Sequence, residues 1–189
     1  MEQAKVGAKL KGIGVIHLTE CIQKSYGDEG WRHVLEHVSP ETRRMLESPV
    51  AWEWYPVRQV VEAECAVLER FHGGDCTRAF VFGEYSLQQS IHNVYRVLFR
   101  LLETGFLVKK SAQLWRTFID QGSLQVEQLD SKRIRLRVCD FDPVHPAYCH
   151  DLRGSFHASL AACGAKTPEV VHTECVLSGA PACLFEARW

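Results

Sequence analysis

The spacing of apolar residues changes from a helical period to a strand period near Gly122, and this change constrains the fold more than any other feature of the chain. Before this point apolar residues recur every three to four positions, as in the stripe that starts at Val57, reaches Phe71 and ends at Gly73. After it, the segment 133–138 alternates arginine with aliphatic residues, which is typical of an antiparallel strand with one solvated face. The pattern therefore predicts an α+β fold.

Local signals predict where several helices begin. Asp28 after Gly27 and Ser39 before Pro40 are favourable N-terminal caps, because their side-chain oxygens accept hydrogen bonds from free backbone amides. The aromatic stretch 48–56 between such helices is predicted to be a loop. Further helices are predicted over 57–71, 87–102 and 106–118.

The last third of the chain predicts a β-β-α-β-β arrangement. Its strands are expected over 123–129, 133–138, 169–177 and 182–189, with a helix over 147–163. We therefore expect helices packed on a four-stranded antiparallel sheet. No linker or repeat divides the chain, so 1–189 is expected to be a single domain with a helical part (1–120) and a sheet part (121–189).

Charge and composition narrow the classes of partner. The net charge of −1 gives no general attraction to nucleic acid or to an anionic membrane, and no apolar run is long enough to span a bilayer. The start of the chain lacks the apolar core of a secretion signal, which predicts a cytoplasmic protein. In a reducing compartment the eight cysteines are expected to be free thiols or metal ligands rather than disulfides.

Three cysteines near the end of the chain are predicted to meet at the sheet. Cys175 and Cys183 lie in the last two predicted strands with core-facing parity, and Cys149 lies on the apolar stripe of the helix that must cover them. With His172 they form a candidate metal site of the Cys3His type, suited to zinc. A strand irregularity is needed here, because His172 has the opposite parity to Cys175.

Two alternatives to this site remain open. His145 or His150 could supply the imidazole instead of His172. The thiols could also be ordinary core residues, since free cysteines are among the most frequently buried side chains.

Aromatic residues suggest a ligand pocket, whereas motifs for catalysis are missing. The candidate pocket residues are Trp52, Trp54, Tyr55, Tyr95, Phe99 and Trp115. The alternative for most of them is core packing. No phosphate-binding loop and no nucleophile elbow occurs in the sequence, so we expect a protein that is not an enzyme.

The end of the chain resembles the vinyl-4-reductase type of small-molecule sensor domain. The matching positions are Cys149, Gly154, Cys175, Gly179, Cys183 and Phe185. In aromatic-sensing members of that group the cysteines bind zinc together with an acidic residue, at the position that His172 occupies here. The whole chain is also similar to a myxobacterial family of uncharacterised paralogues, through "LWRTFIDQGSLQVEQL", "HPAYC" and "HTEC…GAPACLFE".

The opening "GVIHLTECIQKSYGDEGW" is similar to haem nitric oxide/oxygen-binding domains, which share a superfamily with TRAPP tethering subunits. In those domains a histidine in the helix before the sheet ligates the haem iron, and a Tyr-x-Ser-x-Arg motif binds the haem propionates. This chain offers Trp115 in that helix and lacks the motif, so haem is not expected. His17 and His92 are the remaining candidate iron ligands.

These observations predict a non-enzymatic cytoplasmic sensor or regulatory binding module with an apolar pocket and a structural zinc site. We expect a small apolar or aromatic ligand, a protein partner and a homodimer. The alternative is a scaffold or assembly subunit that acts through dimerisation, as the tethering relatives suggest. A haem-based gas sensor ranks third.

Overall fold

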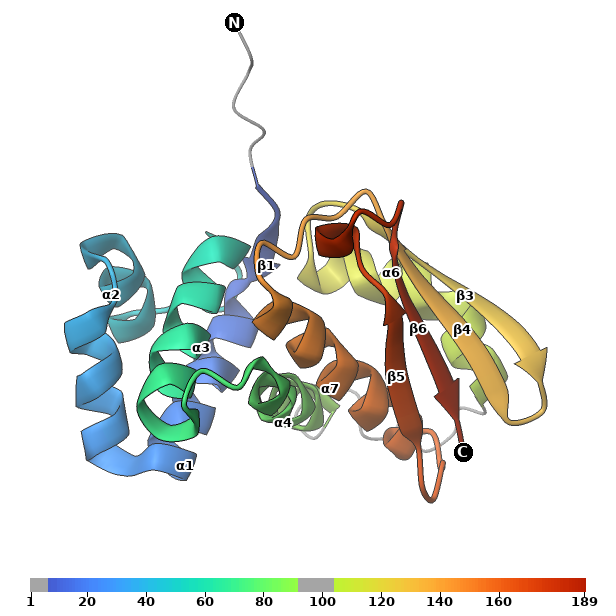
Figure 1. Ribbon diagram of the computed structural model, residues 1–189, viewed down its shortest axis with the longest axis horizontal. Coiled ribbons are helices and arrows are strands. Elements are labelled where there is room, and N and C mark those ends of the chain that lie inside the picture. The colour runs from blue at the N-terminus through green and yellow to red at the C-terminus, as the bar shows by residue number, and fades with distance from the viewer. Residues whose placement is uncertain (1–6, 92–103) are drawn as a thin grey trace, which may run out of the picture.

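The structure is a computed structural model that describes residues 7–91 and 104–189, without the side chains of 104–109 and 111. The predicted α+β fold is confirmed: helices from the first part of the chain pack against a four-stranded antiparallel sheet (Figure 1). Most of the helix predicted over 87–102 lies outside the described residues.

The helices predicted over 57–71, 106–118 and 147–163 are found to within two residues of those bounds. Two others begin earlier than predicted, one at Gly12 rather than at Asp28 and one at Phe80 rather than at Leu87. The described helices are α1 (Gly12–His37), α2 (Pro40–Glu47), α3 (Val57–His72), α4 (Phe80–Ser90), α6 (Thr104–Phe118) and α7 (Pro146–Ala162). Ser39 caps α2 by accepting a hydrogen bond from the backbone amide of Thr42, and Gly73 ends α3 in the left-handed conformation. Gly27, at φ +63°, interrupts α1 just before Asp28, where the sequence predicts a new helix. Among the described helices, none is long and apolar enough to cross a membrane.

The main sheet has the strand order β3-β4-β6-β5. Its strands are β3 (Ser123–Asp130), β4 (Arg133–Cys139), β5 (Glu169–Glu174) and β6 (Cys183–Arg188). Ile134 and Leu136 are buried on the face that meets the helices, and Arg135 on the opposite face pairs with Glu127 and Glu186. The predicted alternation of β4 is therefore confirmed.

Two predictions about strands need correction. The strand predicted over 169–177 ends at Glu174, because the chain turns into a short 3-10 helix over Val176–Ser178. The loop predicted over 48–56 contains β2 (Trp54–Pro56), which pairs with β1 (Lys9–Lys11) in a small antiparallel sheet. Sequence pattern missed this sheet because each strand has three residues, too few for a recognisable alternation.

Helix α7 lies between the helical layer and the sheet (Figure 1). On one side its Phe156 packs edge-to-face on Phe185 of β6, with ring centroids 5.1 Å apart. On the other side α7 crosses α4 at Gly83 and Gly154. A Cβ on either glycine would overlap the backbone of the opposite helix, so the two backbones touch directly.

We predict that Gly83→Ala lowers the free energy of unfolding by about 3 kcal/mol or more, because the added methyl group forces α4 away from Asp151 of α7. Urea denaturation measures the effect. Gln88→Ala, at an exposed position of the same helix, is the matched control and should change stability by less than about 0.5 kcal/mol. Equal stability of the two variants would contradict the close crossing.

Candidate functional site

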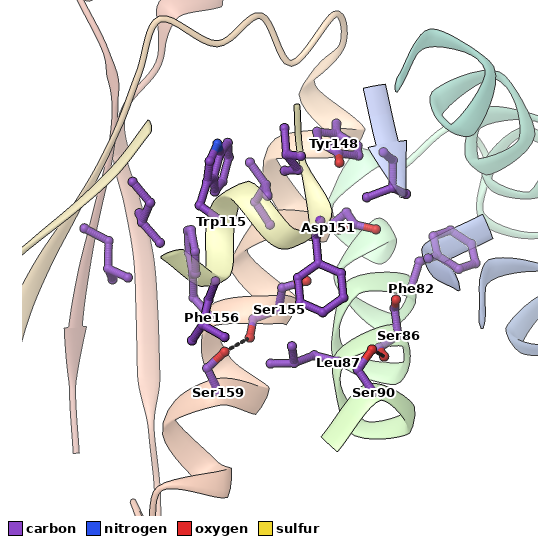
Figure 2. A pocket seen from close by; sticks show the side chains of 18 of the residues that line it. Phe82, Ser86, Leu87, Ser90, Trp115, Tyr148, Asp151, Ser155, Phe156 and Ser159 are labelled. Atoms are coloured by element: carbon purple, nitrogen blue, oxygen red, sulfur yellow. Dashed lines mark hydrogen bonds between the residues drawn. The ribbon is translucent and has the colours of Figure 1, made fainter. Parts of the chain in front are cut away.

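A largely apolar cavity of about 170 Å³ lies between the helices and the sheet (Figure 2). Trp115 and Phe156 line it on the side of the strands, and Phe82, Ser86 and Ser90 line it on the side of α4. Aliphatic side chains of β1, α1, α3, β3 and β4 complete the wall. They include Leu10, Leu18, Val60, Leu124, Val126, Ile134 and Leu136. Every layer of the fold therefore contributes to this cavity.

Two acidic residues line the cavity, Glu64 from α3 and Asp151 from α7. Glu64 is fully buried, and apart from a hydrogen bond that it shares with Asp151 its carboxyl group has no partner among the described residues. Burial, together with the charge of Asp151 and this hydrogen bond, raises the pKa of Glu64 well above its ordinary value, and burial raises the pKa of Asp151 to about 6. Of the two groups, Glu64 therefore holds its proton more strongly, and Asp151 is the one that ionises first.

The surroundings of the acid pair do not neutralise this charge. Burial raises the pKa of Tyr148, which also lines the cavity, and the pKa of the Cys21 thiol on α1, so both are uncharged at neutral pH. No lysine, arginine or histidine is among the described residues that line the cavity. An apolar chamber thus contains a negative charge without a cationic partner, an arrangement that is unfavourable for stability alone.

The four residues of the predicted metal site lie close together in the structure. They form a second candidate site, on the face of α7 that is turned away from α4. The ligand atoms of Cys149, His172, Cys175 and Cys183 all lie within 4.8 Å of one another. The Sγ atom of Cys175 is 3.7 Å from that of Cys149 and 3.9 Å from that of Cys183. A tetrahedral ion with metal–sulfur bonds of ~2.3 Å places its sulfur atoms about 3.8 Å apart.

The strand irregularity that this cluster needs is present. The register of β5 against β6 shifts between His172 and Glu174, after which Cys175 leaves the strand. The ring of His172 faces inward and stacks on Phe185 at 4.3 Å, with its Nε2 atom buried and without a partner among the described residues. The shift therefore brings the imidazole and the thiol to the same side of the sheet.

The thiols of the cluster are unequal. Hydrogen bonding from Cys149, and also from His172, lowers the pKa of Cys183 to about 4 despite burial, while the same hydrogen bond and burial raise the pKa of Cys149. Metal ions bind the thiolate form of cysteine, so metal binding would release the proton that Cys149 still carries.

The other imidazoles proposed for the cluster lie elsewhere. His145 caps α7, where its Nδ1 atom accepts a hydrogen bond from the amide of Ala147 and lies 3.6 Å from Sγ of Cys65. His150 does not belong to the group of four ligand atoms. Among the described residues, His172 is thus the histidine that the structure brings to the cysteines.

The predicted pocket residues divide into three groups. Trp115 lines the cavity, and its indole nitrogen donates a hydrogen bond to the carbonyl of Gln121. Trp52, Trp54 and Tyr55 do not line it: Trp52 is 75% exposed, and β2 holds the other two in the small sheet. Tyr95 and Phe99 lie outside the described residues.

The sequence analysis missed the acid pair. Glu64 follows Val60 and Val61 on the apolar stripe of α3, where a charged residue is out of place, and this was the available signal. Its partner could not be identified from the sequence, because Asp151 comes from a helix that only the packed fold brings close.

Comparison with solved structures gives a consistent result. The fold is similar to an H-NOX protein from S. oneidensis (TM-score 0.75, 17% identity, 95% of each chain covered). It is also similar to an Fe(II) unliganded H-NOX protein variant from K. algicida (TM-score 0.74, 11% identity, 95% of this chain and 96% of that chain). A further neighbour comes from work on modulating haem redox potential through porphyrin distortion (TM-score 0.65, 11% identity). No family model and no curated protein sequence matches the chain.

These neighbours correct two predictions. The main functional prediction, a sensor or binding module without haem and with structural zinc, is contradicted, because the fold is that of haem-associated H-NOX domains. The prediction that zinc is the cofactor and that haem is not expected is contradicted for the same reason. The vinyl-4-reductase and myxobacterial resemblances find no support in these comparisons.

We predict that the acid pair makes the protein less stable as pH rises. The folded-state pKa values lie above those of the unfolded chain, so the folded protein binds protons more strongly. The free energy of unfolding therefore falls from pH ~4 through the pKa of Asp151, about 6, and further towards that of Glu64. Glu64→Gln should flatten this slope and raise stability at pH 8 by roughly 1–3 kcal/mol.

Urea denaturation at several pH values measures the slope. Glu69→Gln, at an exposed position of the same helix, should keep the wild-type slope. A wild-type slope in Glu64→Gln would contradict the raised pKa of this carboxyl group.

Proposed function

We propose that this protein is a haem-based gas-sensor domain of the H-NOX fold, with the cavity between helices and sheet as the haem site. The observation that carries the proposal is the likeness to H-NOX proteins over 95% of the chain, combined with an apolar cavity that all layers of the fold enclose. Bound haem supplies an iron atom that can bind a diatomic gas.

The lining of the cavity suits a flat, apolar ring. Trp115 and Phe118 of α6, together with the aliphatic side chains of β3 and β4, would contact the faces and edges of the macrocycle and exclude water. At about 170 Å³ the cavity is smaller than the ~300–1,000 Å³ of typical ligand pockets, so α6 and the sheet have to separate from the other helices to admit haem.

His17 is the described histidine best suited to bind iron. It is 2% exposed and lies on α1 between Gly14 and Leu18, which both line the cavity, whereas His17 itself is not part of the lining. Burial lowers the pKa of His17, so its ring is neutral. Its Nδ1 atom lies 3.4 Å from Oγ of Ser90, and the ring also makes a hydrogen bond to the backbone of Ser86. A ring that donates through Nδ1 would leave the lone pair of Nε2 for a metal.

We predict that haem added to the purified protein gives a Soret band with one haem per chain, and that His17→Ala lowers haem affinity at least about tenfold, or about 1.4 kcal/mol. Added imidazole should restore the spectrum of His17→Ala. His37→Ala, at the exposed end of α1, is the control and should bind haem as the wild type does. Absence of haem binding would disprove the function. An unchanged spectrum in His17→Ala would show that another residue binds the iron, such as His92, which lies outside the described residues.

The cysteine cluster supports a second proposal. Cys149, His172, Cys175 and Cys183 would together occupy all four positions of a tetrahedral thiophilic ion, leaving none open for catalysis. Since the four ligands come from α7, β5, β6 and the turn after β5, the ion would fix the helix to the sheet.

We predict that cobalt(II) added to the reduced protein gives the absorption bands of tetrahedral thiolate coordination at about one ion per chain. Cys175→Ser should weaken this binding by at least about tenfold. Cys163→Ser, at the end of α7 and outside the cluster, should bind cobalt as the wild type does. Equal binding by the two variants would disprove the site.

We also propose the finer features that the sequence predicts. The chain would act as a single cytoplasmic domain over 1–189, without enzymatic activity, as a homodimer that passes its signal to a separate protein. The kinship with vinyl-4-reductase domains and with the myxobacterial paralogues belongs to this proposal as well, and its support is the sequence pattern around Cys149, Cys175 and Cys183.

A further inference from the structure

We propose that the Glu64–Asp151 pair is the recognition element of a small-molecule subsite, which binds a compact apolar molecule carrying a protonated amine. This inference rests on the proposed function only in its use of the same cavity. It concerns the end of the cavity formed by α3, α4 and α7. The proposed contacts of the haem ring lie towards α6 and the sheet, but the proposed iron ligand, His17, lies beside Ser90 of α4, so haem and the amine would compete for the cavity.

The geometry places the pair where a ligand can reach it. Both residues line the cavity, and the side chain of Asp151 points away from the strands, towards the helical layer (Figure 2). Apart from the hydrogen bond that it shares with Asp151, the buried carboxyl group of Glu64 has no partner among the described residues. Protein side chains therefore leave acceptor positions unused inside the cavity, and these positions are available to a ligand.

The charge of the pair determines the class of ligand. Two carboxyl groups line a cavity whose described lining offers no cation, and Asp151, with a pKa of about 6, is largely ionised at pH 7. A primary ammonium group has three N–H donors and one positive charge, so it can satisfy the free oxygens and neutralise the site at once. A carboxylate or phosphate ligand would be repelled.

The other residues that line the cavity determine what the rest of the ligand, apart from its ammonium group, can be. Beside the acids the wall is aliphatic or aromatic, with Phe82, Leu18 and Val60 on the helical side. Hydroxyl groups of Ser86, Ser90 and Ser155 are the other polar contacts there. A volume of about 170 Å³ favours a molecule smaller than a drug-sized ligand, with a short apolar body behind its ammonium group.

Calorimetric titration of the haem-free, full-length protein with 2-phenylethylamine tests the inference at pH 7. We expect the amine to bind at least tenfold more tightly than 2-phenylethanol, which has a similar body and no charge. Asp151→Asn, which removes the charged carboxylate, should lower amine affinity at least tenfold and leave the weak binding of the alcohol unchanged. Glu64→Gln, which resembles the protonated acid, should keep amine affinity within about threefold of the wild type. Glu69→Gln, exposed on α3, should bind the amine as the wild type does.

Equal affinity for amine and alcohol, full amine binding in Asp151→Asn, or no amine binding to the folded wild type would each overturn the inference. Circular dichroism shows whether the variants are folded, and the comparison of amine with alcohol does not depend on any variant. Haem titration of the same samples keeps this inference separate from the proposed function. Haem binding without amine binding would disprove only the amine subsite. Amine binding without a Soret band would disprove only the proposed haem-sensor function.

Discussion

The direct contact between the backbones of α4 and α7 is the constraint on which the rest of the structure depends. Gly83 and Gly154 allow this approach because neither has a side chain at the crossing. The contact holds α7 against the helical layer, so that its opposite face, with Phe156, meets β6 of the sheet. A helix fixed on both sides positions its other side chains precisely.

Both candidate sites use α7. Asp151 projects from it into the cavity, and Cys149, two residues earlier, meets Cys175 and Cys183 at the sheet. A change in the position of α7 would therefore alter the acid pair and the cysteine cluster together. This gives the domain a physical route by which occupancy of the cavity could reach the surface near β5, through one rigid helix rather than through a chain of flexible contacts.

The acid pair belongs to the part of the site that fold similarity does not determine. Likeness at 11–17% identity concerns the packing of the layers, which many apolar residues can provide. The polar residues within the cavity are not determined by that packing. In this chain α6 contributes Trp115, and α3 and α7 contribute Glu64 and Asp151, so the site has to be understood from its own residues.

The sequence by itself determined the features that depend on neighbouring residues. These are the helices begun by Ser39 or ended by Gly73, the alternating strand β4, and the inward position of Cys149 and Cys183, because caps and periodicity act over a few residues. Only the tertiary structure decided the features that join distant segments. The small sheet of β1 and β2, the register shift at His172, and the pairing of Glu64 with Asp151 arise when separate elements pack, and local pattern carries no information about which buried side chains then meet.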